Sequence, residues 1–195
     1  MEISPIEYVV VGLNLAYIIL AARENIWCWP IGIVASALSI WLFLISGLYA
    51  ESILFTYYVI IGFYGWWAWS KGKNSEKDDL PIVTWSARSH VIALSLGSVL
   101  TAILFFSLSL IPNSEMPLLD SLTTIFSFIA TWMFAKKVLE NWIYWIVLNF
   151  LTTYLYFSRD LKIYGILMIL YVILSVYGYI SWRKDQKLQI QKTRV

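Results

Sequence analysis

The sequence predicts an all-α integral membrane protein with seven transmembrane helices. Hydrophobic residues make up 60% of the chain and charged residues 13%, whereas a soluble domain has roughly 45–50% and about 25%. A chain of 195 residues with this composition cannot cover an exterior that faces water, so lipid must be its solvent. Seven apolar windows, each close to the length that crosses a bilayer, lie near residues 6–22, 29–47, 53–70, 89–110, 118–135, 142–158 and 163–182.

The composition also argues against catalysis. Cys28 and His90 are the single residues of their types, which excludes an internal disulfide, a thiolate metal cluster and a histidine metal site. The chain contains no Gly-rich phosphate loop, no HExxH and no GxSxG. We therefore expect no enzyme activity, no cofactor and no metal, and we expect His90 to lie at the membrane interface.

The distribution of basic residues predicts the orientation. Twelve Lys and Arg residues fall on one side of the predicted spans, and Arg159 and Lys162 fall on the other. Because cytoplasmic loops carry the excess of basic residues, the N-terminus should be outside and the C-terminus cytoplasmic. Glu2 and Glu7 stand where a signal peptide would carry basic residues, so the first helix should be retained. The basic tail is better interpreted as an anchor near anionic lipid than as an arm for nucleic acid.

Two parts of the chain resemble each other. Glu24, Asn25 and Trp29 match Glu140, Asn141 and Trp145 at one spacing, and Tyr64, Gly65 and Trp69 match Tyr177, Gly178 and Trp182 at a spacing three residues shorter. This pattern predicts two parallel three-helix bundles joined by an inverting linker helix, an arrangement that places a substrate path at the shared interface near mid-membrane. The predicted divisions are a first repeat (1–70), a cytoplasmic linker (71–88), an inversion helix (89–110), a second repeat (111–183) and a basic cytoplasmic tail (184–195).

One face of the predicted sixth helix is polar and aromatic. At 100° per residue, a single arc holds Trp142, Trp145, Asn149, Thr152, Thr153 and Tyr156. Hydrogen bonds between helices and an interfacial Trp belt would explain such a face. Asn149, however, lies about halfway through the span, where an amide needs a partner and is a functional candidate by default. We interpret the arc as part of a substrate path.

Four further aromatic residues are candidates for the same path. Trp29 is the counterpart of Trp145 in the first repeat, and Tyr57, Tyr64 and Tyr177 would add aromatic surface, although each Tyr could equally be a packing residue. The hydroxyls of the fifth helix are expected to serve packing, because such groups commonly bond their own helix backbone.

The absence of charge in the predicted spans indicates the mechanism. No Asp, Glu, Lys, Arg or His is placed mid-membrane, where a proton-coupled pump would need one. This favours a passive permease. Aromatic side chains without a counter-charge suit a flat ring, particularly a cationic one.

Several strings occur together in an order that identifies a family. ENIWCWPIGI, GLYAE, YYVIIGFYGWWAW, LDSLTTI, KKVLENWIYWIVLN and YGYISWRK resemble the PnuC family of bacterial vitamin transporters along nearly the whole chain. The resemblance implies a SWEET-like fold, an inner-membrane homotrimer, and facilitated diffusion of nicotinamide riboside with trapping by cytoplasmic phosphorylation.

The resemblance also assigns residues. The family's WxxW motif falls on Trp142 and Trp145, which are implied to stack against nicotinamide and ribose, and its intramembrane polar position falls on Asn149. Phe55 and Thr131 stand where the family often carries Gln, which weakens the implied recognition of the carboxamide.

Two alternatives remain open from the sequence. Thiamine, or riboflavin, is the runner-up substrate, because relatives of this superfamily are similar to transporters of those vitamins. A membrane assembly or sensor subunit that transports nothing is an alternative of a different class, and it would have a filled, dry interface between the repeats.

Overall fold

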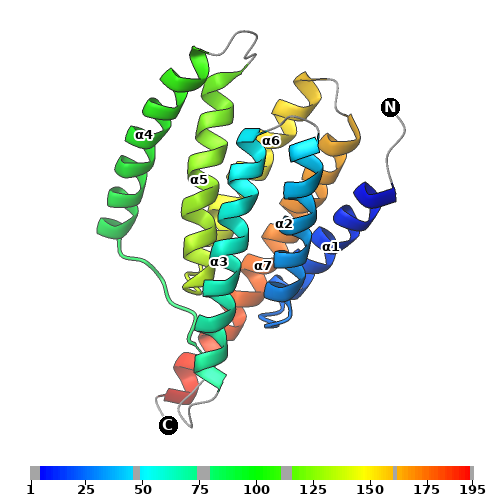
Figure 1. The fold of residues 1–195 in the computed structure, drawn as a ribbon. Coiled ribbons are helices and arrows are strands. Elements are labelled where there is room, and N and C mark those ends of the chain that lie inside the picture. Colours follow the sequence, from blue (N-terminus) through cyan, green and yellow to red (C-terminus); the bar gives the residue numbers. More distant parts are fainter. Residues whose placement is uncertain (1–4, 46–48, 74–79, 111–115, 160–161, 194–195) are drawn as a thin grey trace. The chain divides into compact units, whose positions relative to one another are not determined.

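The computed structural model describes residues 5–45, 49–73, 80–110, 116–159 and 162–193. Outside them lie a third of the predicted cytoplasmic linker (residues 74–79), one end of the second predicted span (46–47), the first residues of the predicted second repeat (111–115) and the last residues of the tail (194–195). Within the described residues the chain forms seven helices (Figure 1): α1 (Pro5–Ala22), α2 (Cys28–Ile45), α3 (Tyr49–Lys73), α4 (Ala87–Ser109), α5 (Pro117–Ala135), α6 (Asn141–Ser158) and α7 (Lys162–Thr193).

The helices fall where the apolar windows predict them, and they differ in hydropathy. Among the described residues, the stretches Ala87–Ser109, Pro117–Ala135 and Tyr164–Lys192 are long and apolar enough to cross a membrane, and Tyr8–Ala22 and Cys28–Leu42 are shorter apolar helices. Helices α3 and α6 carry several Trp and Tyr side chains.

Helix α7 continues far beyond the predicted span end at Trp182. The segment predicted as a separate basic tail is helical through Thr193. No Gly or Pro follows Gly178, and the added residues are mostly good helix formers such as Lys, Gln, Arg and Leu. The helix therefore has no stop signal at Trp182.

The chain divides into two compact units, each described by itself. Unit 1 comprises the described parts of residues 1–82, 135–137 and 180–195, and unit 2 those of residues 83–134 and 138–179. In unit 1, α2 packs against both α1 and α3. In unit 2, α4 packs on α5, where Gly97 allows the side chains of Phe126 and Ile129 to approach its backbone.

The start of α2 has two features that are typical of helix starts. The side-chain Oδ1 of Asn25 accepts the backbone N–H of Trp27 at 3.0 Å, one residue before α2 begins at Cys28. Pro30 lies in the first turn, where its missing N–H removes no helical hydrogen bond. Trp27 itself is exposed.

A buried ion pair lies at one end of unit 1. Lys137 Nζ is 2.7 Å from Glu24 Oε2, and the Lys137 side chain is only 6% exposed. Both residues have left-handed backbone, with φ values of 52° for Glu24 and 51° for Lys137, which is uncommon outside glycine. The Lys137 ammonium also lies 4.7 Å from the centre of the Trp69 ring. The basic-residue count treats Lys137 as a surface cation, whereas the structure buries it against a carboxylate and an indole.

Two indoles complete this end of unit 1 by capping helices. Trp69 Nε1 donates to the carbonyl of Ala135 at 3.2 Å, and Trp182 Nε1 donates to the carbonyl of Ala21 at 3.0 Å. These carbonyls belong to the last turns of α5 and α1, where helices lack internal donors. The rings of Trp69 and Trp182 lie 6.0 Å apart.

A tryptophan lies against a glycine in the same way in each unit. The Trp29 indole covers Gly65 of α3 in unit 1, and the Trp142 indole covers Gly178 of α7 in unit 2. The two tryptophans are 113 residues apart and so are the two glycines, the same separation as Glu24 and Lys137. Helices α2 and α6 are both 18 residues long. By environment the counterpart of Trp29 is Trp142, whereas the sequence comparison pairs it with Trp145.

Two further contacts position α4 beside α6 in unit 2. The backbone N–H of Trp85 donates to Glu140 Oε2 at 3.2 Å. His90 Nδ1 lies 3.1 Å from the hydroxyl of Tyr144, and the two rings stack at 5.9 Å. His90 is therefore half-buried with a polar partner.

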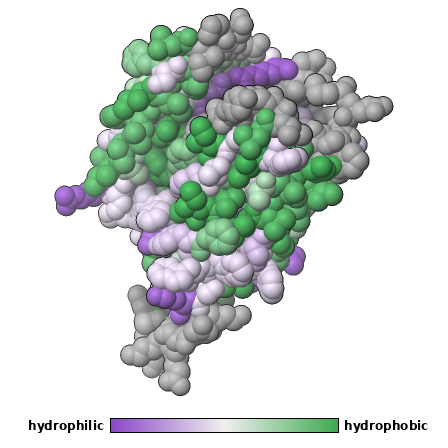
Figure 2. All heavy atoms as spheres, in the orientation of Figure 1, coloured by the Kyte–Doolittle hydropathy of each residue, from purple (hydrophilic) through white to green (hydrophobic). Residues whose placement is uncertain are grey.

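Helix α4 is apolar on most of its surface. Figure 2 shows hydrophobic side chains over most of its visible face, and the exposed residues include Val91, Leu96, Val99, Ile103 and Phe106. Such a surface suits lipid as its solvent.

Removing one member of the buried ion pair should destabilise unit 1. Glu24→Gln leaves the Lys137 ammonium buried without its carboxylate, and this should lower the free energy of unfolding by about 3–5 kcal/mol. The double variant Glu24→Gln/Lys137→Met should lose less unfolding free energy than the sum of the losses in the two single variants. Unfolding in detergent micelles would measure these losses. Additive losses would mean that the two side chains do not interact.

The same pair predicts a pH effect. Burial raises the pKa of Glu24 above its ordinary value of 4.5, although Lys137 lowers it in part. A carboxyl whose pKa is raised by folding contributes stability below about pH 4.5, and that contribution is lost as the pH rises through the folded value. In Lys137→Met the lowering by Lys137 is absent, so the loss of melting temperature should shrink as the pH falls towards 4.5. A loss that does not change with pH would contradict this account.

Adding a methyl group at Gly178 should disturb the packing of Trp142. An ideal Cβ there would lie 2.7 Å from the Trp142 ring, and overpacking of this kind lowers stability by about 1–3 kcal/mol. Gly178→Ala should therefore lower the melting temperature of the purified protein. Gly12→Ala is the matched control, because a Cβ at Gly12 of α1 meets nothing within 4 Å. Equal melting temperatures for the two variants would show that the indole moves aside freely.

Candidate functional site

The predicted arc of α6 lies on the side of the helix that packs inside unit 2. The opposite side carries exposed apolar residues at intervals of three and four, namely Ile143, Val147, Phe150, Tyr154 and Phe157. Within the arc, Trp142 and Asn149 are buried, whereas Trp145, Thr152, Thr153 and Tyr156 are half-buried. The structure therefore groups all six predicted residues on the α6 face that is turned away from the exposed surface.

Asn149 has a partner on the neighbouring helix. Its Nδ2 donates to Ser175 Oγ of α7 at 3.1 Å, and both side chains are buried. The backbone carbonyl of Asn149 accepts the hydroxyl of Thr153 at 2.7 Å. Part of the polar face thus serves hydrogen bonding between and within helices, as the alternative interpretation expected.

Ser175 is a site residue that the sequence reasoning missed. It lies in the apolar run of α7 between Ile166 and Val176, and its exposure is 0%. An isolated hydroxyl in such a run was the available signal, but nothing in the sequence indicates that it faces Asn149.

Three aromatic candidates of unit 2, Trp142, Tyr156 and Tyr177, differ in exposure. The Trp142 ring, which covers Gly178, also meets Phe134 edge to face at 6.0 Å between ring centres. Both contacts are packing contacts. Tyr156 lies 5.9 Å from Tyr164 between ring centres. Tyr177 is 47% exposed, which makes it the most accessible of the seven candidates in this unit.

The other three candidates, Trp29, Tyr57 and Tyr64, belong to unit 1. Trp29 is buried and meets Trp69 edge to face at 5.4 Å. Tyr57 is half-buried and lies 6.0 Å from its neighbour Tyr58. The ring of Tyr64 has the Lys136 ammonium 5.0 Å from its centre, so a cation already occupies one side of this aromatic surface.

The hydroxyls of α5 bond their own helix. Thr123 donates to the carbonyl of Leu119 at 2.8 Å, and Thr131 donates to that of Ser127 at 2.7 Å. The expectation that this face serves packing is confirmed for these two residues.

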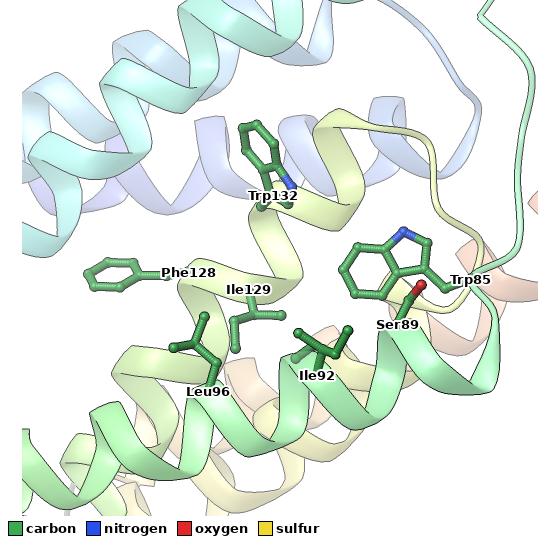
Figure 3. Close-up of a pocket in the computed structure, with 8 residues that line it drawn as sticks. Trp85, Ser89, Ile92, Leu96, Phe128, Ile129 and Trp132 are labelled. Atoms are coloured by element: carbon green, nitrogen blue, oxygen red, sulfur yellow. The ribbon is translucent and has the colours of Figure 1, made fainter.

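An apolar groove of about 530 Å³ runs between α4 and α5 in unit 2. Trp85 and Ser89 lie at one end, and Leu96 and Phe128 lie at the other (Figure 3). None of the residues predicted to bind substrate lines it. Its lining has one hydroxyl and no charged side chain, so hydrocarbon is the chemistry that it suits.

Comparison with known proteins identifies the chain's relatives. The family model described as nicotinamide mononucleotide transporter matches residues 4–184. The nicotinamide riboside transporter PnuC of Neisseria mucosa is 26% identical over 86% of this chain and 67% of its own length. The riboflavin/roseoflavin transporter RibM of Streptomyces davaonensis is 23% identical over 90% of this chain and 84% of its own length.

A solved structure agrees with these relatives. The crystal structure of the vitamin B3 transporter PnuC superposes with a TM-score of 0.74 at 25% identity, covering 92% of this chain and 80% of that one. Together with the family match over residues 4–184 and the apolar helices, this similarity shows that the chain belongs to the PnuC family of bacterial vitamin transporters and is a multi-pass membrane protein.

Proposed function

We propose that the chain is a passive transporter for nicotinamide riboside in the bacterial inner membrane. The observation that carries the proposal is the buried amide of Asn149 near the middle of α6, on the same face as Trp142 and Trp145. An amide can hydrogen-bond the carboxamide of nicotinamide, and indoles can stack on its cationic ring, each contact contributing about 0.5–2 kcal/mol. The half-buried Trp145 is better placed to meet a ligand than Trp142, which covers Gly178.

Facilitated diffusion is the mechanism that the charge distribution supports. The middle of each predicted span lacks the titratable side chains that couple transport to protons. Net uptake would then follow the substrate gradient, and phosphorylation of nicotinamide riboside in the cytoplasm would keep the substrate inside.

The fold within this proposal is a pair of parallel three-helix repeats around α4, with the N-terminus outside and the C-terminus cytoplasmic. Similar Trp–Gly contacts and equal spacings in the two units support the repeats. The proposed assembly is a homotrimer, which the mass of the complex in native mass spectrometry would test.

A flavin is the second candidate substrate. RibM, named as a riboflavin/roseoflavin transporter, is similar over 90% of this chain, and a flavin ring is also flat and stacks on indoles. Thiamine is a third candidate, because its thiazolium ring is cationic. A non-transporting assembly or sensor subunit is the alternative of a different class.

Uptake into sealed vesicles tests both substrate and mechanism. Purified protein reconstituted in vesicles should equilibrate labelled nicotinamide riboside to equal concentrations inside and outside, with or without a pH gradient. Protein-free vesicles are the control. Accumulation driven by an imposed pH step would overturn the passive mechanism, and transport of riboflavin or thiamine alone would overturn the substrate assignment.

Variants of the α6 face should separate binding from packing. Trp145→Ala and Asn149→Ala should each weaken nicotinamide riboside binding by roughly 10-fold, equivalent to about 1.4 kcal/mol, as measured by calorimetry. Trp27→Ala is the matched control, because Trp27 is 63% exposed in the turn before α2 and should leave affinity unchanged. Equal and small effects in all three variants would assign the α6 face to packing.

A further inference from the structure

The groove between α4 and α5 has two ends of different chemistry (Figure 3). Trp85 and Ser89 lie at one end, and Leu96 and Phe128 lie at the other. Within the described lining, the hydroxyl of Ser89 lies at the first end, and the second end consists of hydrocarbon side chains. The groove therefore matches a molecule that is polar at one end and apolar along the rest of its length.

A small residue of α4 forms the floor of the groove. Ala93 lines it and is buried, whereas Ile92 and Leu96, which line it on either side of Ala93 in the sequence, are 57% and 56% exposed. The groove is thus open along the apolar surface of α4, a surface that suits lipid as its solvent.

The length of the groove distinguishes between two apolar occupants. A helix rises about 1.5 Å per residue, so the lining from Trp85 to Leu96 extends over roughly 16 Å. The hydrocarbon core of a bilayer is about 30 Å thick, and one leaflet accounts for half of it. A transmembrane helix of a second copy would cross the whole core. The groove fits an acyl chain of a single leaflet better.

The polar end of the groove also carries positive charge. Arg88 is exposed, and it directly precedes Ser89 and lies one helical turn before Ile92, both of which line the groove. The first turn of α4 has no acidic side chain, and a helix N-terminus carries the positive end of the helix dipole. Glu140, whose carboxylate accepts the backbone N–H of Trp85 at 3.2 Å, is not part of the lining. This end therefore attracts an anionic headgroup.

We propose that the groove binds one acyl chain of an anionic phospholipid, with the lipid phosphate beside Arg88 and the chain running from Ser89 towards Phe128. In the predicted orientation the polar end lies at the cytoplasmic leaflet, whose anionic lipids attract basic residues. The proposal goes beyond the transport function, because none of the residues proposed to bind the vitamin lines the groove.

The test measures lipid bound to the purified full-length protein by native mass spectrometry. The probes are phosphatidylglycerol and phosphatidylcholine that carry the same acyl chains. The wild type should bind phosphatidylglycerol roughly 5-fold more tightly, the effect of one basic residue near an anionic lipid. Arg88→Gln should abolish this preference and leave phosphatidylcholine binding unchanged. Arg88→Lys, which keeps the charge, should retain the preference.

Variants of the lining test the position of the acyl chain. Ala93→Leu raises the floor of the groove and should weaken the binding of both lipids by roughly 10-fold, because fewer methylene groups of the chain are buried. Leu96→Asn places an amide at the apolar end and should also weaken both. Leu96 is 56% exposed, so this variant serves if Ala93→Leu does not fold. Val99→Asn is the matched control, because Val99 of α4 is 58% exposed and does not line the groove.

Three results would overturn the proposal. The first is equal affinity of the wild type for the two lipids, and the second is an effect of Val99→Asn as large as that of Leu96→Asn. The third is a lower number of copies in the Ala93→Leu assembly with unchanged lipid binding, which would assign the groove to a second copy of the chain. Each would leave the proposed function intact, because uptake of nicotinamide riboside into vesicles tests that function separately.

Discussion

The buried contact between Lys137 and Glu24 is the constraint on which the rest of unit 1 depends. An ammonium that is 6% exposed requires a carboxylate beside it, and the left-handed backbone at both residues turns the chain so that the two side chains meet. Trp69 lies beside Lys137 and Trp182 lies beside Trp69, and the two indoles donate to the ends of α5 and α1. Four separate stretches of the chain are thereby held at one point. Burial raises the pKa of Glu24 despite the attraction of Lys137.

Hydrophobic periodicity predicts the seven helices well, because the length and polarity of each window depend only on local sequence. It does not predict which distant residues contact each other in the folded chain. Lys137 counts as a loop cation in the sequence, since its burial depends on a residue 113 positions away. The sequence comparison pairs Trp29 with Trp145, because the Glu-Asn dipeptides before them match by identity. In the structure, Trp29 packs on Gly65 and Trp142 packs on Gly178, so the tryptophan with the similar environment is Trp142.

The candidate site is likewise predictable from local sequence only in part. The face of α6 that holds Trp142, Trp145 and Asn149 follows from the helical period, and the structure places the exposed apolar residues opposite it. Whether a residue on that face contacts a neighbouring helix or remains available to a ligand is a property of the tertiary structure. Trp142 covers a glycine of α7, and Asn149 shares its nitrogen with Ser175. Neither α7 residue carries a signal in the sequence that ties it to α6.

The relatives indicate which kind of interaction must determine substrate specificity in this fold. Proteins named as transporters of nicotinamide riboside and of riboflavin are both similar to this chain over most of its length, so helix packing does not by itself select the vitamin. Stacking on indoles accepts any flat ring, and it cannot separate these substrates sharply. Discrimination has to come from the few buried polar groups, whose hydrogen bonds a wrong ligand would leave unpaired. In unit 2 the buried amide of Asn149, on the same α6 face as Trp142 and Trp145, is the group that we propose for this discrimination.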